Sequence, residues 1–270
     1  MKVSSAQPFQ LIYSLMNHEY WGFLLEAHVV QLDNKGRLTL LHQSLSVKNA
    51  EEFRSGLETA DFQLIKLIDA SHQEVIWKKF SAKKLTPAEF MARTYDPQKG
   101  DKPLQDLIAG YLEKIRAEMM PLLHQRRLFV MGNDGNPIWQ EIEILTEKAT
   151  VLFHFVRNED NTHYYPTIKY AGQKVEFQYK NAFILCNEPA WMICENKLYH
   201  FDKEVDGKKL QPFLRKKFIV IPKKIEEDYY RKFVTSIITS FDVYARGFEI
   251  RSELCVWGWR WFLPMAASST

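Results

Sequence analysis

The stretch ATVLFHFVRNEDNTHYYPTIKY, residues 149–170, decides the fold. Two runs rich in β-branched and aromatic residues, 149–157 and 164–170, lie on either side of the polar segment NEDNTH. This pattern is typical of two antiparallel strands joined by a turn. We therefore predict a β-hairpin here, as part of a larger antiparallel sheet.

Further short strands are predicted on both sides of this hairpin. Upstream, RLFVM and IWQEIEIL are separated by the turn GNDGNP, and downstream come VEFQYK, NAFILC and a hairpin around "EN", residues 195–196. Short apolar runs punctuated by Gly, Asn, Asp and Pro favour an antiparallel meander or small barrel. A helical pattern then returns through Tyr229, Phe233, Ile237 and Ile238.

The first part of the chain predicts a hairpin followed by helices. EYWGFLLEAHVVQL and RLTLLHQSLS are joined by DNKG, a hairpin signal, and residues 46–127 repeat apolar side chains at helical spacing. We predict capping boxes at Asn49 with Glu52 and at Thr86 with Glu89, the second followed by a proline at the first helical position. Pro121 is expected to end or kink the last helix.

These patterns predict an α+β fold. We expect an N-terminal hairpin plus helical region over residues 1–127, a β-rich region with a C-terminal helix over 128–252, and a divergent tail over 253–270. The boundary is placed near Arg127, where the apolar period changes from helical to alternating.

Composition bounds the class of protein. The chain has 270 residues, of which 46 % are hydrophobic and 26 % charged, and a net charge of +3, so nucleic-acid binding would have to be local. Three cysteines without a CxxC pair favour a reducing compartment and argue against a cysteine-built zinc site. We find no signal peptide and no apolar run long enough to span a membrane. We expect a cytoplasmic protein without a membrane partner, nucleoid-associated if it meets DNA.

The common catalytic motifs are missing. No GxxxxGK[ST], GxGxxG, HExxH or GxSxG string occurs, so we assign no catalytic, cofactor-binding or metal-binding residue. Two alternatives stay open, a metal held by three histidines and a nucleophilic cysteine with a histidine, although apolar strand neighbours favour structural roles. The residues concerned are His154, His163, His200, Cys186 and Cys194. The carboxylates of EED, 226–228, are expected to complement a helix dipole.

The basic stretch DGKKLQPFLRKKFIVIPKK, residues 206–224, is the remaining candidate site. Residues 203–232 hold ten Lys or Arg against five Asp or Glu, and such clustering suits contacts with phosphates. The alternative is that the charges flank a buried strand, FIVIP, and block its pairing with other chains. The candidate nucleic-acid-binding residues are Lys208, Lys209, Arg215, Lys216, Lys217, Lys223 and Lys224.

Long strings of the chain resemble a known family. FQLIYSL, VVQLD, RLTL, LFVMGNDGNP, ATVLFHFVRNEDNTHYYPTIKY, CNEPAW, LYHF, DGKKLQPFLRKKFIVIP and VYARGFEI are similar to the N-terminal region of bacterial Swi/Snf-type helicases, particularly those of the Bacteroidetes. The resemblance spans about residues 8–252. It implies a non-catalytic accessory or regulatory module of an ATP-dependent DNA translocase, which contacts double-stranded DNA, the motor lobes or another protein.

The chain departs from that family in two places. It has no Walker A or DExH-type motif, and DASH, residues 69–72, has Ser where an acidic residue should stand. After about Glu253 it continues as CVWGWRWFLPMAASST, which we interpret as the product of a frameshift or truncation. A protein-interaction module without direct nucleic-acid contact is the alternative function, suggested by the high content of aromatic residues.

Overall fold

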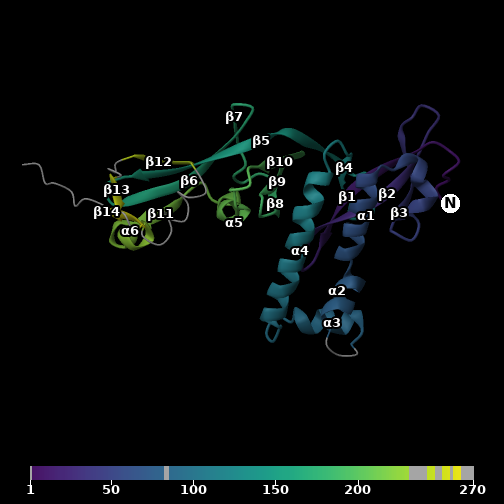
Figure 1. Ribbon diagram of the computed structural model, residues 1–270, viewed down its shortest axis with the longest axis horizontal. Helices are drawn as coiled ribbons and strands as arrows, with labels where there is room; N and C mark the ends of the chain where they lie inside the picture. The colour runs from purple at the N-terminus through teal and green to yellow at the C-terminus, as the bar shows by residue number, and fades with distance from the viewer. Residues whose placement is uncertain (1, 82–84, 231–241, 247–250, 256–257, 263–270) are drawn as a thin grey trace, which may run out of the picture.

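The fold is α+β, as predicted, and is seen in a computed structural model that describes residues 2–81, 85–230, 242–246, 251–255 and 258–262. The first part contains β1 (Phe9–His18), β2 (Gly22–Leu32), β3 (Leu38–Leu45), the 3-10 helix η1 (Ala50–Gly56), α1 (Thr59–Ser71), α2 (Gln73–Phe80), α3 (Pro87–Thr94) and α4 (Lys102–Leu122). The four α-helices lie together at one end of the molecule, beside β1, β2 and β3 (Figure 1).

The rest of the chain is mostly β-structure. It contains β4 (Leu128–Val130), β5 (Gln140–Arg157), β6 (Asn161–Tyr170), β7 (Gln173–Val175), β8 (Ala182–Cys186), β9 (Trp191–Cys194), β10 (Lys197–Phe201), α5 (Gly207–Leu210), the 3-10 helix η2 (Gln211–Leu214), β11 (Ile219–Pro222), α6 (Lys223–Tyr229), β12 (Asp242–Arg246), β13 (Arg251–Cys255) and β14 (Gly258–Phe262). The predicted helix beyond α6, through Phe233 and Ile237, and the last residues of the tail lie outside the described residues.

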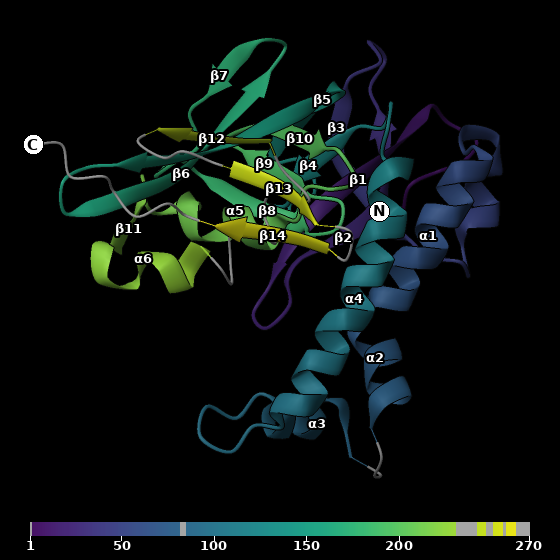
Figure 2. The same cartoon turned by 60° about the vertical axis from the view of Figure 1, so that its left-hand side comes forward.

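Twelve of the described strands form one mixed sheet. Its main path is β3-β2-β1-β4-β5-β10-β9-β8, and β6 and β12 flank the second half of β5. Most neighbours are antiparallel, but β1 with β4, β10 with β5 and β12 with β5 are parallel. β11 pairs with β6 and lies far from the helices at the opposite end (Figures 1 and 2). The tail strands β13 and β14 form a separate two-stranded sheet.

Strand β5 corrects one prediction. The runs IWQEIEIL and ATVLFHFVR are not two strands but one strand of 18 residues. Where the polar residues Thr146, Glu147 and Lys148 suggested a break, pairing with β10 jumps from Ile144 to Lys148 while β10 advances only from Leu198 to His200. This irregularity absorbs the polar residues as a bulge, so the strand bends instead of ending.

Pro166 lies in the middle of strand β6, where a proline is unusual. On one edge β6 pairs with β5, and on its other edge it pairs with β11 at Asn161–Thr162–His163–Tyr164 and with β7 from Ile168 onward. Pro166 therefore lies in the gap between these two partners. A proline, which has no N–H to donate, is tolerated at such a position because the strand edge is locally unpaired there.

The helix starts were predicted with mixed success. Thr86 and Glu89 form a capping box and Pro87 begins α3, as expected. The predicted box at Asn49 and Glu52 is wrong, because the Asn49 amide oxygen accepts hydrogen bonds from Ser46 and a 3-10 helix follows. The box that starts α1 is formed by Glu58 and Asp61. α4 ends at Leu122, one residue after Pro121.

Asp61 also connects α1 to the sheet. Its side chain, 5 % exposed, accepts hydrogen bonds from the Tyr13 hydroxyl (2.8 Å) on β1 and from Arg126 Nε (2.7 Å), which precedes β4. Burial, together with the Asp61 carboxylate, raises the pKa of Tyr13, so the phenol remains a donor. A buried carboxylate satisfied in this way fixes the position of α1 over a core that includes Leu64 and Ile65.

We predict that Asp61→Ala lowers the free energy of unfolding by about 2–3 kcal/mol, because it leaves Arg126 with only the exposed Glu58 as an ion-pair partner and the buried Tyr13 hydroxyl without its acceptor. Tyr13→Phe should cost only about 1 kcal/mol, the net value of one hydrogen bond. Urea unfolding measures both. Lys78→Ala, which removes an exposed ion pair with Glu74, is the control and should leave the unfolding midpoint unchanged. An Asp61→Ala midpoint equal to that control would refute this role.

Candidate nucleic-acid interface

Five of the predicted basic residues flank strand β11. Arg215, Lys216 and Lys217 precede the strand, Lys223 and Lys224 follow it, and all five side chains are exposed. The nearest members of the two groups, Lys217 and Lys223, are six residues apart, so their backbones are separated by at most roughly 20 Å. The structure therefore presents this part of the stretch as two clusters of basic side chains, and the second cluster shares α6 with the exposed acids Glu227 and Asp228.

The two remaining predicted residues lie elsewhere. Lys208 and Lys209 belong to α5, which lies apart from α6 (Figure 1). The Lys208 Nζ is 3.6 Å from a carboxylate oxygen of Glu188, and Lys209 is half-buried. These two lysines are thus not brought together with the β11 clusters.

Local packing fixes the positions of α5 and η2, which directly precede Arg215. The Asp206 side chain caps α5 by accepting from the Lys208 N–H (2.8 Å). Gly207 lies so close to the sheet that a Cβ there would come within 2.7 Å of Ile184 Cγ2. Phe213 of η2 is fully buried in the second core. The backbone from 206 to 214 is therefore anchored before the chain reaches the cationic run.

Strand β11 corrects the expectation that FIVIP is core throughout. Ile221 is buried, but Phe218 is 43 % and Val220 46 % exposed. β11 pairs only with β6 among the described strands, so it is an edge strand with one covered face. Phe218 stacks on the His163 ring of β6, with 4.3 Å between centroids. Lysines and a proline at the ends of such an edge also discourage pairing with other chains.

Helix α6 is held by a buried carboxylate. Glu226 is in its first turn, as expected, but its side chain is only 6 % exposed. It accepts hydrogen bonds from the Arg157 guanidinium of β5, the Thr162 hydroxyl of β6 and the Tyr230 hydroxyl. The sequence suggested only a dipole role for this residue. The contacts show that it joins α6, and thus Lys223 and Lys224, to the sheet.

The two candidate cysteine nucleophiles are buried. Burial, with Glu113 nearby, raises the pKa of the Cys186 thiol to about 12, and burial also raises the pKa of Cys194. The Cys186 thiol donates to Glu113 at 3.3 Å, and the Cys194 sulfur faces the Glu176 carbonyl. Raised pKa values disfavour the thiolate that a nucleophile requires, so the geometry favours the structural interpretation.

The three candidate metal-binding histidines are separate. His154 stacks on Tyr165, His163 on Phe218 and His200 on Trp191, with ring centroids 4.8, 4.3 and 4.9 Å apart. Within the described ranges, no group of three or more His, Cys, Asp or Glu side chains is arranged to hold a metal ion. Nor does any described helix combine the length and apolar character needed to cross a membrane.

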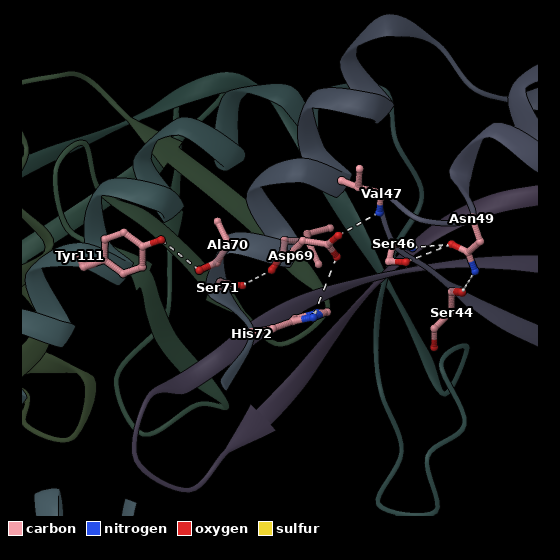
Figure 3. Close-up of polar contacts among 10 residues, drawn as sticks. Ser44, Ser46, Val47, Asn49, Asp69, Ala70, Ser71, His72 and Tyr111 are labelled. Carbon is pink, nitrogen blue, oxygen red and sulfur yellow. Dashed lines mark hydrogen bonds and ion pairs between the residues drawn. The ribbon is translucent and has the colours of Figure 1, made fainter. Parts of the chain in front are cut away.

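The DASH segment ends helix α1 and holds the loop after β3 (Figure 3). Asp69 Oδ2 accepts from the Val47 N–H (2.9 Å), and the Ser71 hydroxyl donates to the Ile68 carbonyl (2.7 Å). The Tyr111 hydroxyl of α4 donates to the Ala70 carbonyl at 3.1 Å. These contacts tie together β3, α1 and α4, which is a structural role.

The sequence did not indicate two arrangements of charged residues. One is the Arg157–Thr162–Glu226 group described above, whose members are up to 69 residues apart. The other is Glu113 of α4, which accepts hydrogen bonds from Cys186, the last residue of β8, and from Asn187, which follows it. In the sequence, Glu226 looks like any acidic residue in the first turn of a helix. Only the pairing of β11 with β6 brings its partners Arg157 and Thr162 close to it.

Comparisons with known proteins return no relatives. No protein-family model matches the chain, and neither a curated protein nor a solved structure does. The Swi/Snf resemblance therefore stays a prediction from the quoted strings.

The contacts of Glu226 predict that the attachment of α6 to the sheet weakens in acid. Burial alone would raise the pKa of Glu226, but hydrogen bonds from Arg157 and Thr162 outweigh burial and hold the pKa below its ordinary 4.5. A carboxyl whose pKa is lowered in the folded state stabilises the fold fully above its unfolded pKa, and this contribution disappears as pH falls through the folded pKa.

We therefore expect Glu226→Gln to be less stable than the parent at pH 7 by about 1–3 kcal/mol. The difference should shrink as pH falls below about 4.5 and through the lowered pKa of the folded state, because the parent carboxylate then also becomes protonated. Urea unfolding across pH 3 to 7 tests this, with Glu147→Gln, an exposed carboxylate on β5, as the control. A gap that stays constant across this range would contradict the assignment.

Proposed function

We propose that this chain is a non-catalytic module that contacts double-stranded DNA through the basic residues on either side of β11. The observation that supports this most strongly is their placement: five exposed cations form two clusters at the ends of a short strand. Phosphate contacts supply most of the affinity of proteins that bind DNA without sequence preference. A site of this kind needs no base-reading side chain.

The two clusters can meet different phosphates of one duplex. They lie at opposite ends of β11, and double-stranded DNA carries one negative charge per about 1.7 Å of its axis. Arginine and lysine differ here, because Arg215 can bind a phosphate with two donors while the lysines act as point charges. The side chains of β11 would then face the duplex without specifying bases.

The resemblance to Swi/Snf-type helicases adds a setting to this proposal. In that setting the chain is an accessory or regulatory region of an ATP-dependent translocase, and the motor lobes are its second partner. DNA contact by such a region would keep the duplex near the motor. The proposal assigns no ATP-binding or catalytic role to this chain.

A second candidate function is protein interaction, favoured by the apolar side chains on the same surface. Three large apolar side chains that lie within eight residues of sequence are 43–46 % exposed: Phe218, Val220 and Ile225. Such exposure is high for neighbouring apolar residues. Val220→Thr separates the two functions. DNA binding through phosphates should be unaffected by it, whereas binding of a protein to β11 should weaken.

The DNA proposal is tested by neutralising four lysines together. We expect Lys216→Gln, Lys217→Gln, Lys223→Gln and Lys224→Gln, combined, to weaken binding of a 20-base-pair duplex at low salt by about tenfold or more. The slope of log affinity against log salt should also become shallower by about 3 to 4. Fluorescence anisotropy over a salt series measures both.

The matched control carries the same loss of charge elsewhere. Lys35, Lys66, Lys99 and Lys114 are exposed lysines of the helical part and its hairpin, and their combined replacement by Gln should leave duplex affinity within about twofold of the parent. Equal loss in both variants would mean that net charge alone attracts DNA. No duplex binding by the parent at low salt would end the proposal.

A further inference from the structure

A cavity at the opposite end of the molecule carries an inference independent of DNA binding. It has a volume of about 210 Å³ and is bounded by the turn after β1, the end of α3 and the first half of α4. Its lining residues are Tyr20, Trp21, Tyr95, Lys102, Gln105, Asp106, Ala109, Leu112 and Arg116. α3 and the start of α4 lie far from α6 and β11 (Figure 1).

One wall of the cavity is aromatic and rigid. The Tyr20 and Tyr95 rings stack, with 4.6 Å between centroids and 16° between planes. Tyr95 is held in place because its hydroxyl oxygen accepts a hydrogen bond from Trp21 Nε1 at 2.6 Å. Tyr20 is 41 % exposed, so part of its ring faces the cavity opening or solvent. A planar ring can stack against such a wall at low entropic cost.

The cavity also contains a positively charged group, the half-buried guanidinium of Arg116. The Arg116 side chain is only 17 % exposed, and its Nη2 donates to the backbone carbonyls of Trp21 and Phe23. Its Nη1 lies 3.9 Å from Glu113, beyond hydrogen-bond distance, so among the described residues Nε and Nη1 keep donors for another acceptor. Because Arg116 is oriented by two carbonyls, the fork is preorganised for an anion.

The charge of the lining favours an anion. Arg116 and Lys102 are cationic and Asp106 is the one anionic lining residue, with its Oδ1 3.0 Å from Lys102 Nζ. The Asp106 and Lys102 side chains are 66 % and 74 % exposed, so water screens that pair, whereas Arg116 lies deeper. Glu113, which approaches Arg116 from outside the lining, is itself engaged by Asn187 and Cys186.

We propose that this cavity binds a small aromatic carboxylate, with its ring against the Tyr20–Tyr95 wall and its carboxylate on Arg116. The size of the cavity limits the ligand to one ring and a short acidic group. Aliphatic acids would lack the stacking contact, and aromatic cations would meet Arg116 with the wrong charge. The lining contains no thiol, and its one acid, Asp106, is paired with Lys102 in solvent, so the proposal concerns binding alone.

Three small probes test the chemistry on the full chain. Benzoate should bind with a dissociation constant of roughly 1 mM or below, whereas acetate and benzamidine should bind at least about tenfold more weakly. Saturation-transfer NMR with a concentration series measures all three. Equal binding of benzoate and acetate would overturn the role of the aromatic wall, and equal binding of benzamidine would overturn the role of Arg116.

A pair of variants on α4 tests whether benzoate binds in this cavity. Ala109 lines the cavity and is exposed, so Ala109→Trp should fill the space and weaken benzoate by about tenfold or more without disturbing the core. Leu107→Trp, at a 59 % exposed position of the same helix outside the lining, should bind benzoate like the parent. Unweakened binding by Ala109→Trp at a parent-like unfolding midpoint would place benzoate elsewhere and overturn the proposal.

Benzoate binding and DNA binding can be tested independently of each other. Ala109→Trp should leave duplex affinity unchanged, because α3 and the start of α4, which bound the cavity, lie far from β11 (Figure 1). Arg116→Lys, which keeps the charge but loses the fork, should bind benzoate more weakly than the parent. Parent-like benzoate binding by Arg116→Lys would refute the guanidinium contact.

Discussion

Continuous backbone pairing along β5 is the constraint on which the rest of this structure depends. Its first residues pair with β4, which in turn pairs with β1 and so with the helical part. Its second half pairs with β6 and β12. The same strand contributes Ile142 to the core under the helices and Phe153 and Phe155 to the other core. A break in β5 would leave each core without its shared strand, and it would detach β11 and α6 from the rest.

Three carboxylates, two of them buried and Glu113 half-buried, then fix the helices to this sheet. Asp61 connects α1 to β1, Glu113 connects α4 to the segment after β8, and Glu226 connects α6 to β5 and β6. Each accepts at least two hydrogen bonds, which offsets the cost of removing its charge from water. The α4 contact matters for the cavity. Arg116, about one turn from Glu113, donates to the backbone carbonyls of Trp21 and Phe23, so α4 meets the β1–β2 hairpin close to where Glu113 meets the end of β8.

Local signals in the sequence were sufficient where one segment determines its own structure. The Thr86–Glu89 box, the hairpin of β9 and β10 and the hairpin of β2 and β3 all follow from short-range patterns. They fail where a partner far along the chain decides. The polar residues 146–148 look like a turn until β10 supplies a bulged neighbour. Phe218 and Val220 look like core until β11 is seen to be an edge. Likewise Tyr20 and Tyr95 meet only because the β1–β2 turn reaches α3.

The residues of the candidate site were predicted from the sequence, but their arrangement in space was not. The basic stretch could be found by counting charges, but its division into two clusters around β11, and the separation of Lys208 and Lys209, required the topology.

Lysine footprinting tests whether the clusters around β11 contact DNA. Reductive methylation with and without duplex at low salt, read by mass spectrometry, should show protection of Lys216, Lys217, Lys223 and Lys224. Lys35, Lys66, Lys99 and Lys114 should react equally in both samples. Equal methylation of the β11 lysines with and without bound duplex would show that these residues do not contact DNA.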